Sequence, residues 1–226
     1  MKLTLLPPAK SLNKSYLKQS LKREQIELFK ANLARLFDRV NEKESEENLK
    51  NIVSDFLKDT WYKSGYEINT KERADLVIHN GKSSSDPVGV IAEVKKPTNK
   101  AEMISPDRPN AKALHELLHY YLQERFLKEN KEIRHLIVCN IYEWYIFDAV
   151  DFERFFFHNK KLTGAYKKWS EGLFGLSTTD WFYQEMAKPF IEKELTELPC
   201  TCFNLKDFEK IIRNPAKADD KKLINC

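Results

Sequence analysis

The sequence predicts an α/β protein in which helices flank one mixed β-sheet. Apolar residues recur at steps of three and four in residues 26–56 and in residues 111–128, as they do in helices that bury one face. Several short apolar runs have the length of strands. These strand candidates are residues 66–69, 74–78, 88–94, 135–139 and 144–147. The order of helices, three strands, a helix and two strands is typical of a layered α/β fold.

Length and composition indicate one domain in the cytoplasm. A chain of 226 residues with 42% hydrophobic residues can bury a full core. Leu3–Leu6 is too short for a signal-peptide core, and no apolar run approaches the ~18 residues of a membrane span. The four cysteines lack the paired spacing of a zinc site, so we expect reduced thiols.

Positive charge is concentrated at the N-terminus. The first 23 residues contain six Lys or Arg and no acidic residue, although the whole chain has a net charge of only +4. Residues 1–22 are therefore expected to form a basic arm that could contact a nucleic-acid backbone. A solvated helix face explains the same charges equally well.

Two amphipathic helices follow the arm. The first is expected over residues 26–40, and the polar residues 41–45 interrupt it. The second carries Leu49, Ile52 and Phe56 on its apolar stripe and ends near Trp61. Acidic residues precede this stripe. They could either reach a site at the sheet edge or stabilise the helix N-terminus by interacting with the helix dipole.

The remaining regions differ in character. Residues 23–150 hold the predicted core, with a loop at 98–110 between the central strands and the 111–128 helix. Residues 151–213 are rich in Phe, Trp and Tyr, so we expect a helical extension packed on the core, because aromatic residues are more often core than base-stacking platforms. Residues 214–226 read as a polar tail.

The central feature is a predicted hairpin that carries charge on its strands. Asn80-Gly81 and Asp86-Pro87 suit the reversal between the two runs. Side chains alternate along a strand, so Asp75, Glu93 and Lys95 can share one face. Two carboxylates in a half-buried site repel each other unless a proton or a cation lies between them. This arrangement indicates a divalent-metal site.

The pattern of an acid, any residue and Lys occurs four times in the chain, but only Glu93-Val-Lys95 ends an apolar strand beside another strand acid. Asp75 and Glu93 offer the hard oxygen ligands that Mg²⁺ prefers, and the carbonyl of Val94 could add a third. Lys95 would orient a metal-bound water or stabilise charge on a phosphate. The chemistry indicated is hydrolysis of a phosphodiester.

These residues resemble the PD-(D/E)xK nuclease signature, with Ala74 where a Pro often stands. The resemblance implies a restriction-endonuclease-like core and a site acid from an upstream helix. Glu46 is the expected acid, with Glu42 and Glu47 as alternates. Glu116-x-x-x-Tyr120 resembles the Gln-x-x-x-Tyr element of restriction-type members, with Glu in place of Gln, and is an accessory candidate.

The stretches EVKKPTN (93–99), KALHELLHYYLQER (112–125) and YEWYIFDAVDFE (142–153) resemble the N-terminal nuclease region of type IIG restriction-modification enzymes, and the resemblance covers most of residues 20–160. Those enzymes combine endonuclease, adenine methyltransferase and target recognition. This resemblance implies a Mg²⁺-dependent endonuclease, with Mn²⁺ as a substitute, that acts on double-stranded DNA, with a transient dimer as one route to double-strand cleavage. No Gly-rich loop or Asn-Pro-Pro-aromatic motif is present, so we expect no S-adenosylmethionine site. The methyltransferase and recognition regions would lie outside this chain, which would be either a fragment of a longer enzyme, as we expect, or a stand-alone relative.

Two other functions fit parts of the sequence. His115-Glu116-Leu117-Leu118-His119 matches the His-Glu-x-x-His pattern of zinc proteases, although chance matches to so short a pattern are common. A catalytically silent nuclease fold that binds DNA or a partner chain is the non-enzymatic alternative.

Overall fold

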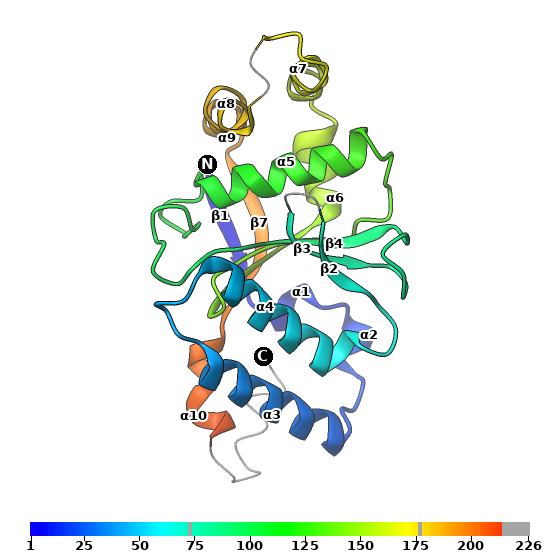
Figure 1. Cartoon of the computed structure of the whole chain (residues 1–226), viewed down its shortest axis with the longest axis vertical. Helices are drawn as coiled ribbons and strands as arrows, with labels where there is room; N and C mark the ends of the chain where they lie inside the picture. Colours follow the sequence, from blue (N-terminus) through cyan, green and yellow to red (C-terminus); the bar gives the residue numbers. More distant parts are fainter. Residues whose placement is uncertain (72–73, 176–177, 214–226) are drawn as a thin grey trace.

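A seven-stranded mixed sheet runs through the centre of the protein (Figure 1). The structure is a computed structural model that describes residues 1–71, 74–175 and 178–213. The strand order is β1-β7-β6-β5-β4-β3-β2, so the sheet is built from both ends of the chain. The strands are β1 (Lys2–Leu6), β2 (Ile68–Lys71), β3 (Ala74–His79), β4 (Val88–Val94), β5 (His135–Cys139), β6 (Glu143–Asp148) and β7 (Glu197–Asn204).

The predicted hairpin is present as the antiparallel pair β3–β4. Its register sets Leu76 opposite Ala92 and Val77 opposite Ile91. Leu76 and Ala92 belong to the core on one face of the sheet, and Val77 and Ile91 belong to the core on the other. The predicted alternation is therefore confirmed along the hairpin, and β4 then continues parallel to β5.

Helices cover both faces of the sheet, which confirms the α/β class. On one face lie α3 (Arg23–Arg39) and α4 (Glu46–Leu57), which continues as a π-helical segment, Lys58–Tyr62, with α10 (Glu209–Ile212) nearby. On the other face α5 (Lys112–Phe126) crosses the strands (Figure 1). The side chain of Ser45 accepts a hydrogen bond from the Asn48 N–H and so caps the start of α4.

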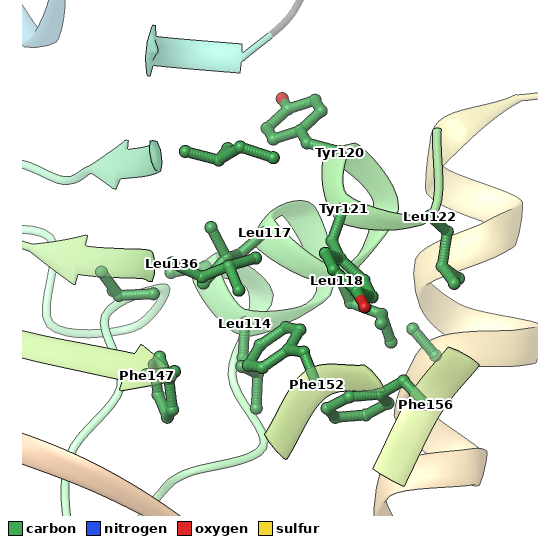
Figure 2. Close-up of a cluster of buried hydrophobic side chains, with 14 of the residues drawn as sticks. Leu114, Leu117, Leu118, Tyr120, Tyr121, Leu122, Leu136, Phe147, Phe152 and Phe156 are labelled. Atoms are coloured by element: carbon green, nitrogen blue, oxygen red, sulfur yellow. The ribbon is translucent and has the colours of Figure 1, made fainter. Parts of the chain in front are cut away.

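The aromatic region after residue 151 packs on α5. Its helices are α6 (Ala149–Phe152), α7 (Lys160–Ser170), α8 (Thr179–Trp181) and α9 (Lys188–Glu194), with π-helical segments at Glu153–Phe157 and Phe182–Ala187. We call Phe152, Phe156, Tyr166, Trp169 and Phe182 the aromatic cluster, since all are at most 5% exposed and join one core with Leu114 and Leu118 of α5. Figure 2 shows Phe152 and Phe156 beneath this helix. The expectation that the aromatic residues are core is confirmed for these five, but it is wrong for Phe174, which is 45% exposed.

Two expectations about the ends of the chain are wrong. Lys2–Leu6, assigned to a basic arm, forms the edge strand β1, and only short helices α1 (Pro8–Ser11) and α2 (Lys14–Leu17) follow it. Glu197–Asn204, assigned to a helical extension, forms β7, which pairs parallel to β1 and antiparallel to β6. The polar tail 214–226 lies outside the described residues.

Two further expectations concern cysteines and membranes. Cys139, Cys200 and Cys202 are free thiols, as expected, and Cys226 is not among the described residues. Within the described part of the chain, none of the helices combines the length and the apolar composition needed to cross a bilayer.

Candidate active site

The β3–β4 hairpin brings Asp75 and Glu93 to one face of the sheet. One step along the ladder from the Leu76–Ala92 pair, Asp75 stands opposite Glu93. The backbone N–H of Val94 donates to Asp75 Oδ2 at 2.9 Å, which fixes that carboxylate against β4. Both residues are buried, with exposed fractions of 7% for Asp75 and 2% for Glu93.

The negative charge of Asp75 makes ionisation of Glu93 less favourable, because the two carboxylates lie in buried, low-dielectric surroundings. Burial raises the pKa of Glu93 well above its usual range, and the negative charge of Asp75 raises it further. Lys95 acts in the opposite direction but does not outweigh these effects. One oxygen of Glu93, Oε2, is buried and has no hydrogen-bond partner. A buried carboxylate with an unused oxygen is a site where a cation or a proton would be stabilised.

Lys95 lies at the centre of a group of carboxylates from different elements. Its Nζ lies 2.7 Å from Glu93 Oε1 and 2.7 Å from Glu116 Oε2, and it is 3.8 Å from Glu102 and 3.9 Å from Glu46. Burial lowers the pKa of Lys95, but the charges of Glu93 and Glu116 outweigh burial and leave it raised. Lys95 is therefore a buried ammonium that stays charged. We call these five residues the Lys95 cluster.

The three candidate helical acids have separate positions. Glu46, the first residue of α4, reaches the Lys95 cluster, and the Lys96 backbone N–H donates to its Oε2 at 3.4 Å. Glu47 instead pairs with Lys50 at 3.3 Å. Glu42 lies before the helix, 4.0 Å from Lys206. Of the three acids, Glu46 is the one whose carboxylate reaches Lys95.

Lys50 is a site residue that the sequence reasoning missed. Its Nζ lies 2.6 Å from Asp75 Oδ1. Burial lowers the pKa of Lys50, but the hydrogen bond and the charge of Asp75 outweigh that effect and raise it. A signal was available, because Lys50 follows Glu46 by four positions and so shares its side of α4.

The loop and helix after β4 add the outer part of the site. Glu102 and Lys112, which the sequence reasoning also missed, pair at 3.1 Å. Lys112 also lies 3.7 Å from Glu116 on the next turn of α5. Burial raises the pKa of Glu102, but hydrogen bonds from Lys112 and Asn99 outweigh this effect and hold the pKa below its ordinary value.

Tyr120 borders the site from α5. Burial raises the pKa of its hydroxyl, and the charge of Glu93 raises it further. Figure 2 shows Tyr120 projecting from α5 on the side away from Phe152 and Phe156. The two accessory candidates, Glu116 and Tyr120, therefore both lie near Glu93.

The atoms that Asp75 and Glu93 offer are oxygens, the donor type that a hard cation prefers. Two carboxylates beside a strand backbone suit Mg²⁺, which takes oxygen ligands and keeps several waters. The unused Oε2 of Glu93 is consistent with such a ligand role. In the arrangement described, however, ammonium groups occupy both carboxylates, and the described residues contain no group of three His, Cys, Asp or Glu side chains poised to hold a metal.

The two histidines of the zinc-protease pattern have different surroundings. His115 Nε2 lies 2.7 Å from Asn110 Oδ1, and burial, with the charge of Lys188, lowers its pKa to about 4. The ring of His119 packs against Trp169 and Phe182 in the aromatic cluster. Glu116, the base in a protease reading, is paired with Lys95. These contacts explain all three residues without zinc.

A separate apolar cavity of about 440 Å³ lies between α3 and the sheet. Its lining includes Phe29, Trp61, Trp144 and Phe203, and it contains no member of the Lys95 cluster. The polar site and this cavity are therefore distinct features of the fold.

Comparison with known proteins gives one match. A family model described as "Domain of unknown function (DUF7149)" covers residues 6–226. No curated protein and no solved structure matches the chain.

Proposed function

The chain belongs to the DUF7149 family, and we propose that it is a metal-dependent endodeoxyribonuclease domain that hydrolyses DNA phosphodiesters. The observation that carries the proposal is the placement of Asp75 and Glu93 on opposed positions of a buried hairpin, with Lys95 in contact with Glu93. These are the residues that resemble the PD-(D/E)xK signature.

The order of elements supports the same proposal. Helix α4, the antiparallel strands β2, β3 and β4, helix α5 and the parallel strand β5 follow one another and surround the site. We propose that this unit is a restriction-endonuclease-like core. Glu46 is the proposed site acid from the upstream helix, since it reaches Lys95.

Each protein group has a role that follows from its chemistry. When bound, Mg²⁺ would neutralise phosphate charge and lower the pKa of a coordinated water. Asp75 and Glu93 supply the carboxylate ligands, and the carbonyl of Val94 is the proposed third oxygen. Lys95 orients the attacking water and donates hydrogen bonds to the phosphoryl oxygens as negative charge builds on them. Glu116 and Glu46 hold the Lys95 ammonium in position.

Hydrolysis requires that the water oxygen bond to phosphorus while the bond from phosphorus to one sugar oxygen breaks, and the released sugar oxygen takes up a proton from solvent. Lys95 is charged and buried, so it acts as a hydrogen-bond donor rather than as the base that takes the water proton. Two partly exposed carboxylates lie beside it, Glu46 at 32% and Glu102 at 33% side-chain exposure. Because Glu102 is paired with Lys112 at 3.1 Å, Glu46 is the proposed acceptor of that proton.

Double-stranded DNA is the proposed partner, and the cleavage module of a type IIG restriction-modification enzyme is the proposed setting. The resemblance to that class places methylation and target recognition in other regions. The isolated chain should then bind DNA weakly, without sequence preference, and with an affinity that falls steeply as salt rises.

A catalytically silent nuclease fold is the second candidate, and one observation favours it. Both strand carboxylates already have ammonium partners, Lys50 for Asp75 and Lys95 for Glu93. A silent module would bind DNA or a partner chain, but neither bind Mn²⁺ nor cut DNA.

A nicking assay on supercoiled plasmid tests the proposal, with Mg²⁺, Mn²⁺, Ca²⁺ or EDTA in parallel. The proposal expects open-circular product with Mg²⁺ or Mn²⁺ and none with EDTA. DNA binding without nicking in any metal would favour the silent module.

A further inference from the structure

Lys50 on α4 forms an ion pair with the buried carboxylate of Asp75. Lys50 Nζ lies 2.6 Å from Asp75 Oδ1, and the two side chains are 16% and 8% exposed. The other oxygen of Asp75 accepts the Val94 N–H at 2.9 Å. In this arrangement both oxygens of Asp75 have partners, and one of those partners is a full positive charge.

A divalent cation bound by Asp75 would need the same carboxylate. An ammonium and a metal ion at one oxygen repel each other, so they cannot both be held there at close range. Lys95 cannot take over the role of Lys50, because its ammonium is held between Glu93 and Glu116. Lys50 and the metal therefore compete for Asp75.

Lys50 has a second partner that lies toward solvent. Its Nζ lies 3.3 Å from Glu47 Oε2, and the Glu47 side chain is 62% exposed. A small rotation of the flexible Lys50 side chain away from Asp75 would leave its charge paired with Glu47. The ammonium can thus leave the buried carboxylate without losing every partner.

We propose that Lys50 is a built-in counter-cation of the metal site, which neutralises Asp75 when no metal is bound and moves to Glu47 when a divalent cation enters. This inference rests on the proposed function, since it concerns metal binding at Asp75. It assigns Lys50 a positioning role, in which the residue sets metal affinity and stabilises the metal-free fold.

The central test is calorimetric titration of Mn²⁺ into the wild type and into Lys50→Met, which keeps the length of the side chain and removes the charge. Lys50→Met should bind Mn²⁺ about tenfold more tightly, as expected if an ion pair of roughly 1.4 kcal/mol no longer competes. Its metal-free form should melt at a lower temperature than the wild type. Lys43→Met is the matched control, because Lys43 is exposed and its loss changes the net charge equally.

Glu47→Gln provides a second variant that does not depend on the folding of Lys50→Met. It removes the charged partner that receives the displaced ammonium, so Mn²⁺ should bind more weakly than in the wild type. Wild-type Mn²⁺ affinity in Glu47→Gln, or no gain in a folded Lys50→Met, overturns the role of Lys50 and leaves the proposed nuclease site standing. If neither the wild type nor Lys50→Met binds Mn²⁺, the proposed metal site fails, and the role of Lys50 fails with it.

Discussion

The ammonium of Lys95, the residue directly after β4, lies 2.7 Å from the carboxylate of Glu116 on α5. With the equal distance from Lys95 to Glu93, this contact ties the helix to the strand through one buried positive charge. Lys95 is only 3% exposed, so the pair is shielded from the solvent screening that weakens surface ion pairs. The residue proposed to act on phosphate is therefore also part of the packing between sheet and helix.

Replacing Lys95 should abolish cleavage and also destabilise the fold. Lys95→Met leaves Glu93 and Glu116 without their shared cation, and breaking a buried ion pair in this way costs about 3–5 kcal/mol. Urea denaturation of the metal-free protein measures the loss. A variant as stable as the wild type would contradict the described position of Lys95.

A second substitution separates stability from catalysis. Glu116→Gln in the Lys95→Met background removes one unpaired carboxylate, so part of the lost stability should return. Cleavage should stay absent, because the proposed donor to the phosphate is still missing. Recovery of nicking in the double variant would show that Lys95 has only a structural role.

Asp75→Ala should lower the stability of the metal-free protein. Repulsion between two carboxylates alone predicts a gain when one is removed. The structure favours a loss, because the change leaves the buried Val94 N–H without its acceptor, at a cost of about 1–3 kcal/mol, and removes the closer of the two carboxylates paired with Lys50. Thermal melting in EDTA decides between the two, and a rise in Tm would contradict the Lys50–Asp75 pair.

His115 should make stability depend on pH below neutrality. Its pKa is lowered from 6.5 to about 4 in the folded protein, so the unfolded chain binds the proton more readily. The protein keeps its full stability above about pH 6.5 and loses about 3 kcal/mol of its free energy of unfolding as the pH falls to about 4.

His115→Gln should remove this part of the pH dependence, which urea denaturation from pH 7.5 to 4.5 would measure. His135→Gln is the control, because His135 is exposed and its replacement should leave the profile close to that of the wild type. Identical profiles for His115→Gln and the wild type would rule out the buried neutral His115.

Replacing Arg125 by Lys should destabilise the protein. Its Nη2 and Nε donate to the two oxygens of Glu153 at 2.6 and 3.0 Å, and Tyr121 donates to the same carboxylate at 2.9 Å. Lys cannot form this forked contact, so Arg125→Lys should cost about 1–2 kcal/mol. Arg134→Lys, at an exposed pair, should change stability by less than about 0.5 kcal/mol. Equal effects of the two changes on urea midpoints would count against the Arg125–Glu153 contact.

The sequence predicted the parts of the fold that have strong periodicity. The β5 strand has the predicted limits, and α3 and α5 lie close to the residues expected for them. The one-sided burial expected for α5 is wrong, because all residues from Ala113 to Leu122 are buried between the sheet and the aromatic region. The β7 strand was missed because ELPCTCFN contains a Pro and lacks a clear alternation of apolar and polar residues. The β1 strand was obscured because the basic residues after it dominated the composition of the region.

The candidate site was predicted in part for similar reasons. Asp75 and Glu93 lie on the neighbouring strands β3 and β4, and Lys95 directly follows β4, so the alternation of side chains predicts that the three share one face. Glu46 could not be separated from Glu42 and Glu47, because the angle at which α4 meets the sheet depends on tertiary packing. Glu102 lies in a loop with no periodicity, and its contact with Lys95 at 3.8 Å becomes evident only in the folded chain.

The most direct test of the account compares plasmid nicking by the wild type, Glu93→Gln and Glu192→Gln, prepared identically and supplied with Mn²⁺. Glu192 is exposed on α9, so its replacement controls for the loss of one carboxylate and for any contaminating nuclease. The account predicts nicking by the wild type and Glu192→Gln, and no nicking above the EDTA control by a folded Glu93→Gln. Nicking by Glu93→Gln at the wild-type rate would contradict a nuclease site at Asp75 and Glu93.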